Sequence, residues 1–315
     1  NMLVGLSTQC MEEMSKYENY AAKSVCFILA FSYQCNLHCT YCYQQHFLDL
    51  DKCKMSENNL IYVLQIIEHF KNEHPDYQIS MGLFGGEPLL PDNKKLIDIV
   101  LDFCVKNRIV LHIQTNGTYL PEYAKTFIIH RGIISGINTT VDSIVANEKT
   151  RSYIKIPSSV QNRNSALNLL KSVKLLLDSK VNVGVEVNID RHNLSEIPAI
   201  IQYFSSKGYL DYHNFNLFIG RVDDRMFETG YPDIILESQV IQELIPLLPL
   251  PKNVHAAFIK TVLSLCTDLG YDFHQNEIRG EYNYCWTSSP LESVFYIDTQ
   301  LDVFRCTYTV GRKNY

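Results

Sequence analysis

The segment Cys35-Asn36-Leu37-His38-Cys39-Thr40-Tyr41-Cys42 contains three of the ten cysteines in the chain. It follows an apolar run from Val25 to Tyr33 that is typical of a buried β-strand. We therefore expect the three thiols to lie in a loop at the carboxyl end of that strand. A four-iron cluster normally binds four cysteines, so three thiolates would leave one iron open to an outside ligand. We expect the chemistry of the protein at that open position.

A structural zinc site is the alternative interpretation of this segment, with His38 or a distant cysteine as the fourth ligand. Zinc sites commonly place short spacers in two separated halves of the chain. Here a three-residue spacer directly adjoins a two-residue spacer, and no second half lies nearby in the sequence. The spacing favours an iron–sulfur cluster.

The composition is typical of a globular protein, because 46% of the 315 residues are hydrophobic and 20% are charged. The net charge of −6 and the lack of a basic stripe argue against a nucleic-acid partner. No apolar run approaches the roughly 20 residues that span a membrane. No secretory leader is recognisable, although the chain opens on Asn1. Clustered cysteines in such a chain predict metal binding in the reducing cytoplasm.

Strand-like and helix-like segments alternate for six rounds, which predicts an α/β fold with a parallel sheet. The predicted strands are Val25–Ser32, Asp76–Phe84, Ile109–Gln114, Gly132–Thr140, Val181–Ile189 and Asn214–Ile219. The predicted helices are Ser56–Phe70, Asn93–Asn107, Pro121–His130, Ser158–Ser179 and Leu194–Ser205. Six units are fewer than a closed barrel requires, so we predict an open, partial (β/α)6 TIM barrel. A doubly wound sheet is the structural alternative.

The alternation stops after about residue 222, and we place a domain boundary near residue 225. The predicted parts are a lead-in segment over 1–22, the partial barrel over 23–225 and a C-terminal extension over 226–315. Within the extension we expect two helices and then a hairpin, at Leu236–Ile245, Asn253–Leu269, and Ser293–Ile297 with Asp302–Arg305.

Four further motifs stand at the carboxyl ends of the predicted strands. They are Gly85-Gly86-Glu87-Pro88, Gln114-Thr115-Asn116-Gly117-Thr118, Thr140-Val141-Asp142 and Asn188-Ile189-Asp190. Together with Cys-x3-Cys-x2-Cys and the aromatic Tyr41, they resemble the signature of radical S-adenosylmethionine (radical SAM) enzymes. The resemblance covers residues 25 to about 220. It is to the branch that modifies peptides and proteins and carries a C-terminal SPASM or twitch extension.

The resemblance implies that Cys35, Cys39 and Cys42 bind a [4Fe–4S] cluster whose open iron takes the amino and carboxylate groups of SAM. An electron from the cluster, supplied by a donor such as a flavodoxin or ferredoxin, would cleave SAM to methionine and a 5′-deoxyadenosyl radical. That radical would abstract hydrogen from a peptide or protein side chain.

The resemblance also implies which residues bind SAM. Gly85, Gly86 and Glu87 are expected at its amino group, with Pro88 stiffening the turn, and Tyr41 is expected near the adenine. The remaining cofactor-binding candidates are Thr115, Asn116, Thr140, Arg151 and Asn188.

Thr140 and Arg151 are the candidates for the SAM carboxylate, since a guanidinium offers a bidentate fork. Asn188 is the candidate for the ribose. A solvated loop charge at Arg151 and a polar strand end at Asn188 are the alternatives. One departure from the family is Ser143 after Asp142, where glycine is frequent.

Cys285 and Cys306 resemble the first two cysteines of the extension, and they are candidate ligands of an auxiliary iron–sulfur cluster. Two cysteines cannot saturate a [4Fe–4S] cluster, and the usual cysteine-rich tail does not follow before Tyr315. We therefore expect a truncated extension. Further ligands would lie beyond Tyr315 or come from Cys266 and a non-cysteine group; otherwise no auxiliary cluster is bound.

The residue after Cys306 is Thr307, where anaerobic sulfatase-maturating enzymes carry an aspartate that serves as a base. We therefore favour an enzyme that matures ribosomally made peptide natural products (RiPPs) over a sulfatase-maturating enzyme. A glycyl-radical activase and a non-catalytic metal-binding scaffold are the further alternatives.

Overall fold

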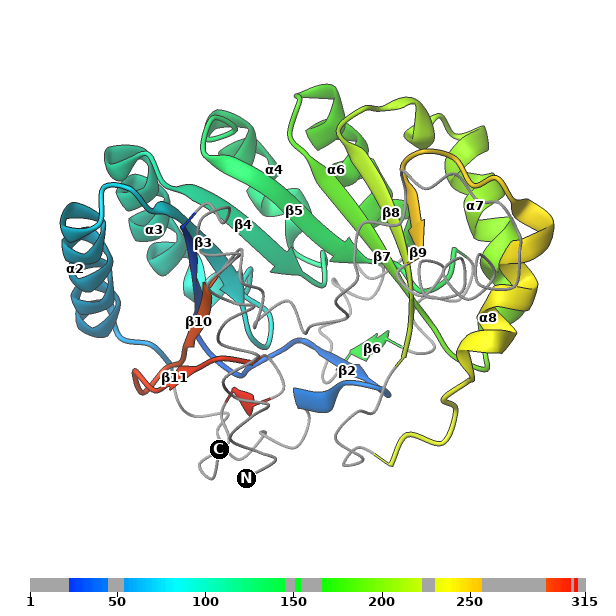
Figure 1. The fold of residues 1–315 in the computed structure, drawn as a ribbon, viewed down its shortest axis with the longest axis horizontal. Helices are drawn as coiled ribbons and strands as arrows, with labels where there is room; N and C mark the ends of the chain where they lie inside the picture. The colour runs from blue at the N-terminus through cyan, green and yellow to red at the C-terminus, as the bar shows by residue number, and fades with distance from the viewer. Residues whose placement is uncertain are drawn as a thin grey trace, which may run out of the picture.

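The computed structural model describes residues 23–44, 54–144, 151–153, 166–222, 230–256, 293–306 and 309–310. Its centre is a curved sheet of nine strands in the order β11-β10-β1-β3-β4-β5-β7-β8-β9. Figure 1 shows the helices along the outer, convex face of this sheet, which leaves its inner face as the hollow side. The carboxyl ends of the strands point toward β2 and β6. The carboxyl ends of the strands therefore meet in one region.

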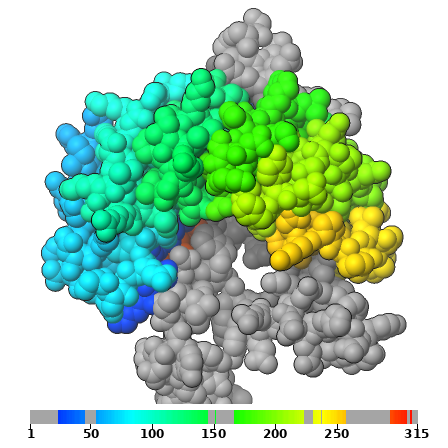
Figure 2. Space-filling view, turned by 90° about the horizontal axis from the view of Figure 1, so that it is seen from above, coloured from blue at the N-terminus to red at the C-terminus, as the bar shows by residue number. Residues whose placement is uncertain are grey.

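Six neighbouring strands form the barrel-like part of the sheet, and each adjacent pair is parallel. They are β1 Ser24–Ala30, β3 Gln78–Phe84, β4 Val110–Thr115, β5 Ile134–Thr140, β7 Val183–Ile189 and β8 Phe215–Arg221. In Figure 2 the outer surface follows an open arc in chain order, from blue to yellow. The arrangement confirms the predicted partial barrel and not the doubly wound alternative, which needs helices on both faces of the sheet.

The connecting segments are mainly helices whose apolar faces pack on the outer side of the sheet. The α-helices are α2 Glu57–Glu73, α3 Lys94–Asn107, α4 Leu120–Ile129, α6 Ala166–Asp178, α7 Ile197–Ser206 and α8 Glu237–Leu244. Short 3-10 turns are η2 Pro91–Asn93, η4 Leu194–Glu196, η5 Tyr209–Asp211 and η6 Ile245–Leu247. No helix in the described ranges is both long and apolar enough to span a membrane.

Helix α2 shows why these elements form where they do. The Ser56 hydroxyl accepts the backbone N–H of Asn59 at 3.1 Å and so caps the first turn. Four apolar side chains at helical spacing are then buried against the sheet: Leu60, Val63, Leu64 and Ile67.

The two faces of the barrel strands differ in polarity. In β4, Leu111 and Ile113 are fully buried in the core, whereas His112 and Gln114 alternate onto the opposite face and are half-buried. Asn138 on β5 and Glu186 on β7 are also half-buried between buried neighbours. The hollow side of the sheet is therefore lined by polar side chains.

Strands from the C-terminal part join the same sheet. β9 Val254–Ala256 pairs with β8, and β10 Ser293–Ile297 pairs with β1, both in parallel. β11 Val303–Phe304 runs antiparallel to β10, which confirms the predicted hairpin. The boundary near residue 225 stays a prediction, and the lead-in 1–22 lies outside the described residues.

The helix predicted over Asn253–Leu269 is wrong at its beginning. Val254 and Ala256 are buried on either side of the exposed His255, which is the two-residue period of a strand. The remainder of that prediction lies outside the described residues.

Candidate active site

The cysteine loop follows β1 and packs directly on the Gly85-Gly86-Glu87-Pro88 motif. A Cβ atom at Gly86 would lie 2.0 Å from the carbonyl oxygen of Gln34, and Gly85 has φ +110°, which favours glycine. The Gly86 N–H donates to the Ser32 carbonyl at 3.2 Å, and the Glu87 N–H donates to the Gln34 carbonyl at 2.7 Å. The two glycines thus allow backbone contact with the segment just before the first cysteine.

Glu87 is 1% exposed, and its carboxylate joins the ends of β3 and β4. One oxygen accepts the Thr115 hydroxyl at 2.7 Å and the Leu89 N–H at 2.8 Å, and the other accepts the Asn116 N–H at 2.6 Å. Burial raises the pKa of Glu87 to about 6, although these three hydrogen bonds oppose the shift. A contact of Glu87 with the SAM amino group stays a prediction.

Asn116 connects the end of β4 to the cysteine loop. Its side-chain N–H group donates to the Asn36 side-chain oxygen Oδ1 at 2.9 Å and to the Cys35 sulfur at 3.5 Å. Its own carbonyl oxygen accepts the Thr118 N–H at 2.9 Å, which fixes the orientation of the amide. The structure thus brings together the motifs predicted at the ends of three neighbouring strands.

A second, two-stranded sheet holds the middle of the cysteine loop. β2 Leu37–Cys39 pairs antiparallel with β6 Arg151–Tyr153, and Cys39 is opposite Arg151. The Cys42 N–H then donates to the Cys39 carbonyl at 3.0 Å and closes the turn. This pairing was not predicted from the sequence, and it places Arg151 beside the candidate ligand loop.

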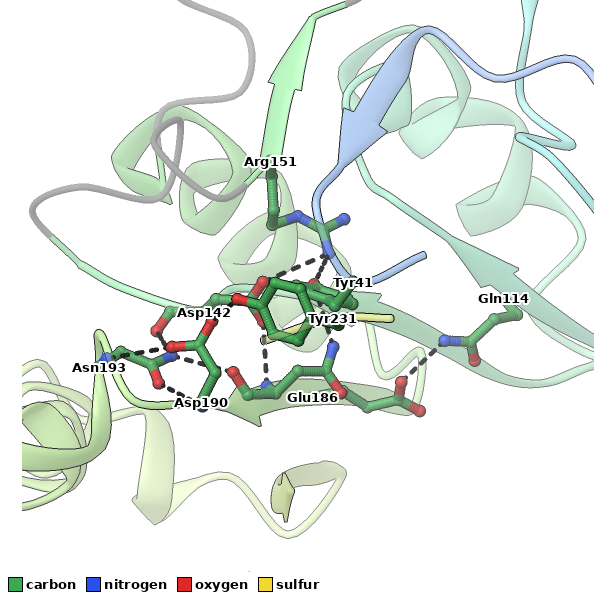
Figure 3. A network of polar contacts seen from close by, with 9 residues as sticks. Tyr41, Gln114, Asp142, Arg151, Glu186, Asp190, Asn193 and Tyr231 are labelled. Carbon is green, nitrogen blue, oxygen red and sulfur yellow. Dashed lines mark hydrogen bonds and ion pairs between the residues drawn. The ribbon is translucent and has the colours of Figure 1, made fainter. Parts of the chain in front are cut away.

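The Tyr41 hydroxyl is the centre of the network drawn in Figure 3. It donates to the Asp142 carboxylate and accepts from Arg151 Nη1 at 2.9 Å and from the Asn188 side-chain amide at 3.3 Å. A phenol has one donor and two acceptor positions, so these three bonds use its full capacity. Residues from the cysteine loop, β6, β7 and the end of β5 thereby converge on one oxygen atom.

Arg151 and Asp142 form a buried ion pair at 3.7 Å, with side chains 5% and 1% exposed. The Asn188 N–H also donates to the Asp142 carboxylate at 3.0 Å. Burial raises the pKa of Asp142, while Arg151, Tyr41 and the Asn188 N–H lower it. Burial likewise raises the pKa of the Tyr41 hydroxyl well above its ordinary value, so this group remains a neutral phenol. The solvated-charge alternative for Arg151 is therefore wrong.

Asp142, Asp190, Asn193 and Tyr231 belong to this region but were not predicted as binding residues. The Asn193 side-chain amide donates to the Asp142 backbone carbonyl at 2.7 Å, and its side-chain oxygen Oδ1 accepts the Asp190 N–H at 2.8 Å. The Tyr231 hydroxyl donates to Asp190, and its ring meets the Tyr41 ring edge-on at 6.3 Å. The Asn188-Ile189-Asp190 motif marked Asp190, but nothing in the sequence marked Tyr231.

The other predicted site residues have these positions. Thr140 is buried at the end of β5, opposite Glu186 of β7. The Pro88 carbonyl accepts the Asn93 side-chain amide at 3.1 Å. Cys306 is a free, half-buried cysteine just after β11, whereas Cys285 lies outside the described residues.

The model of the radical SAM superfamily matches residues 29–204, which is more than half of the chain. The chain belongs to this superfamily. The matched region contains the end of β1 and the whole of β3, β4, β5 and β7, together with the cysteine loop, Tyr41 and the three residues that bond to its hydroxyl. Radical SAM proteins use a [4Fe–4S] cluster and SAM.

Two curated relatives are similar to this radical SAM chain. An uncharacterised protein of Methanocaldococcus jannaschii is 29% identical over 187 residues, which are 58% of this chain and 58% of that protein. A cysteine-type anaerobic sulfatase-maturating enzyme of Clostridium novyi is 22% identical over 183 residues, 56% of this chain and 47% of that enzyme. The chain thus spans about half the length of these relatives.

A solved structure shows the same fold. Streptococcus suis SuiB, bound to the precursor peptide SuiA, superposes on the chain with a TM-score of 0.60 at 14% sequence identity. The superposition covers 98% of this chain and 65% of SuiB. At this identity the likeness concerns the fold alone.

The donor set of the loop fits the radical SAM cluster. Cys35, Cys39 and Cys42 form no disulfide, and the Asn36 side-chain N–H group is buried without a hydrogen-bond partner in the described part of the chain. A cluster sulfide is an acceptor for such a donor. Within the described ranges, no group of three or more His, Cys, Asp or Glu side chains is arranged so that it could hold a single metal ion.

Without a cluster, the environment keeps the Cys35 and Cys39 thiols protonated. Burial, with a contribution from the Glu87 carboxylate, raises the pKa of Cys35 to about 12. Burial also raises the pKa of Cys39 to about 11, although Arg151 opposes that shift. Cluster binding must therefore displace protons from these thiols.

Proposed function

We propose that the chain is an enzyme that cleaves SAM at a [4Fe–4S] cluster bound by Cys35, Cys39 and Cys42, and that it modifies a peptide or protein side chain. When bound, the cluster supplies the electron that cleaves SAM to methionine and a 5′-deoxyadenosyl radical, which abstracts hydrogen from the substrate. The observation that carries the proposal is the pairing of Cys39 with Arg151, because it sets a fixed cation beside the three-cysteine loop.

The residues around the loop would bind and orient SAM. Arg151 would hold its carboxylate, since the guanidinium is already fixed by Asp142 and by the Tyr41 hydroxyl. Thr140 would assist at the carboxylate, and Asn188 at the ribose. The backbone of Gly85 and Gly86, which packs against the segment before Cys35, would present the SAM amino group to the cluster.

We propose further that the substrate is a peptide of the kind modified by RiPP maturases. The support is the shared fold with SuiB, whose structure holds a precursor peptide.

In the whole protein, Cys285 and Cys306 would contribute to an auxiliary cluster of a SPASM or twitch extension. A flavodoxin or ferredoxin would supply electrons in the cytoplasm, where the free thiols stay reduced. No nucleic acid and no membrane takes part.

The test is reductive SAM cleavage by the anaerobically reconstituted chain. With dithionite as reductant, the wild type should form 5′-deoxyadenosine, and the variant with Cys35, Cys39 and Cys42 all replaced by alanine should form none. The matched control is Cys104→Ala, which removes a buried thiol that donates weakly to Met81 in the core. Turnover by the triple variant would refute the assignment, and cluster binding without SAM affinity would favour a non-catalytic scaffold.

Sulfatase maturation is the second candidate, favoured by the similarity to the Clostridium novyi enzyme. Thr307 in place of aspartate after Cys306 argues against it. Incubation with a cysteine-containing sulfatase peptide, followed by mass spectrometry of its cysteine, would decide between sulfatase maturation and RiPP maturation. A mass change would restore this candidate.

A further inference from the structure

A carboxylate on the hollow face of the barrel has no part in the SAM chemistry described above. Glu186 stands two residues before Asn188 on β7, so both side chains project from the same face. Two residues correspond to about 7 Å along a strand. Asn188 contacts the Tyr41 network, and Glu186 lies one layer deeper in the barrel than Asn188, opposite Thr140 of β5.

Two amides on neighbouring strands hold this carboxylate. Gln114 Nε2 donates to one oxygen at 2.9 Å, and Asn138 Nδ2 donates to the other at 3.0 Å. Figure 3 shows the Gln114 contact at the edge of the network. We call Gln114, Asn138 and Glu186 the barrel carboxylate cluster. It spans β4, β5 and β7, three adjacent strands of the sheet.

The sheet leaves room for this cluster. Gly184 is opposite Asn138 in the register, and a Cβ atom at Gly184 would lie 2.4 Å from the Asn138 side-chain oxygen. Glycine at 184 therefore allows Asn138 to lie close over β7 and reach Glu186. The Glu186 carboxylate is thus held in place by side chains of the two neighbouring strands.

The carboxylate of the cluster makes no salt bridge within the described residues; burial raises its pKa, and the Arg151 charge opposes that shift. Both donors to Glu186 are neutral amides, and among the described residues no salt bridge reaches its carboxylate. Each carboxylate oxygen has a second acceptor position. Burial of an unpaired carboxylate is unfavourable, whereas a charged donor brought to it is bound strongly. A ligand with a cationic N–H donor would supply both the charge and the hydrogen bonds.

We propose that the barrel carboxylate cluster binds the protonated side chain of a lysine or arginine in the peptide substrate. The inference rests on the proposed function and narrows its substrate class to peptides with a basic residue near the modified position. Gln114 and Asn138 act as positioning residues, because they orient the carboxylate through hydrogen bonds. Because Glu186 is opposite Thr140 in the register, this subsite adjoins the groups assigned to SAM.

The experiment compares two probe peptides by calorimetry on the anaerobically reconstituted full chain in the presence of SAM. One is acetyl-Ala-Ala-Lys-Ala-Ala-amide, and the other has norleucine, which lacks the ammonium group, in place of lysine. The lysine peptide should bind about tenfold more tightly to the wild type, as expected for one charged hydrogen bond. Glu186→Gln should abolish this ratio, while Glu73→Gln, on the exposed surface of α2, should retain it.

Three results would overturn the proposal. They are equal affinity of the wild type for both peptides, retention of the ratio in Glu186→Gln, and a loss of SAM affinity in that variant as large as the loss for the peptide. The last result would assign the carboxylate to SAM. If Glu186→Gln does not fold, the comparison of the two peptides on the wild type decides alone. Absence of SAM cleavage by the wild type would instead count against the proposed function.

Discussion

Cys39 and Arg151 are opposite residues in a two-stranded antiparallel sheet, although they lie far apart in the sequence. The same Arg151 pairs with the buried Asp142 and donates to the Tyr41 hydroxyl, which belongs to the cysteine loop. One small sheet therefore sets both the ligand loop and the cation that we assign to SAM. A change at Arg151 should affect both.

Replacement of Arg151 by lysine should weaken SAM binding about tenfold, because an ammonium group cannot form the bidentate fork of a guanidinium. Calorimetry on the anaerobically reconstituted protein measures this affinity. The matched control is Arg191→Lys, at a side chain that is 67% exposed. Unchanged SAM affinity in Arg151→Lys would remove this residue from the binding site.

Asp142→Asn should destabilise the fold by about 3–5 kcal/mol, since it leaves the buried Arg151 charge unpaired. Urea unfolding measures the difference from the wild type. Asp98→Asn is the control, because its salt bridge with Lys94 is exposed and should contribute only about 0–1 kcal/mol. An equal fall in the free energy of unfolding in Asp142→Asn and Asp98→Asn would show that the buried pair stabilises the fold no more than the exposed pair does.

Glu87 should make stability depend on pH. Burial raises its pKa from 4.5 to about 6, so between these values the folded chain binds more protons than the unfolded chain. The free energy of unfolding should therefore fall as pH rises through this range, by about 2 kcal/mol, since one pKa unit corresponds to about 1.4 kcal/mol. Other carboxylates titrate in the same range.

The contribution of Glu87 is isolated by comparing urea unfolding at pH 4.5, 5.5 and 6.5 in the wild type, Glu87→Gln and Glu73→Gln. The first variant should lack the fall of about 2 kcal/mol, and the second should keep it. A Glu87→Gln profile parallel to that of the wild type contradicts the raised pKa.

Tyr231→Phe should cost about 1 kcal/mol of stability, because it removes the hydrogen bond to Asp190 but keeps the ring against Tyr41. Tyr62→Phe removes a hydroxyl from a residue that is 56% exposed and should change stability little. Thermal or urea unfolding of both variants makes the comparison. A neutral effect of Tyr231→Phe would mean that water replaces the Asp190 contact.

The barrel and the ligand loop were predictable because their signals are local. The strand before Cys35 is a continuous apolar run, and Gly85-Gly86 marks a turn where side chains do not fit. The carboxyl ends of parallel strands meet at one edge, so motifs in those positions predict a shared site. The structure brings together the loops after β1, β3 and β4 as this argument requires.

The remaining contacts join segments whose own sequence carries no signal. β2 and β6 have three residues each, too few for a periodic pattern, so the neighbour of Cys39 could not be read from the chain. Tyr231 lies after the last barrel strand and looks like an ordinary loop tyrosine. Glu87 was predicted at a ligand, yet its carboxylate makes three hydrogen bonds within the protein, which only the folded loops reveal.

Gly86→Ala offers a direct test of the contact between the glycine motif and the cysteine loop. The new methyl group would lie 2.0 Å from the Gln34 carbonyl oxygen, so the two loops would have to separate. We expect the free energy of unfolding to fall by about 3 kcal/mol or more, at the upper end of the range for overpacked sites. The effect should be large because both clashing groups belong to the backbone and cannot rotate away. Gly132→Ala is the matched control, since a Cβ atom there meets nothing within 4 Å. The free energy of unfolding, measured in urea, and the iron content after reconstitution should both fall in Gly86→Ala. Both should stay near the wild-type values in Gly132→Ala. Equal iron content in the two variants would show that the cysteine loop keeps its conformation without this contact.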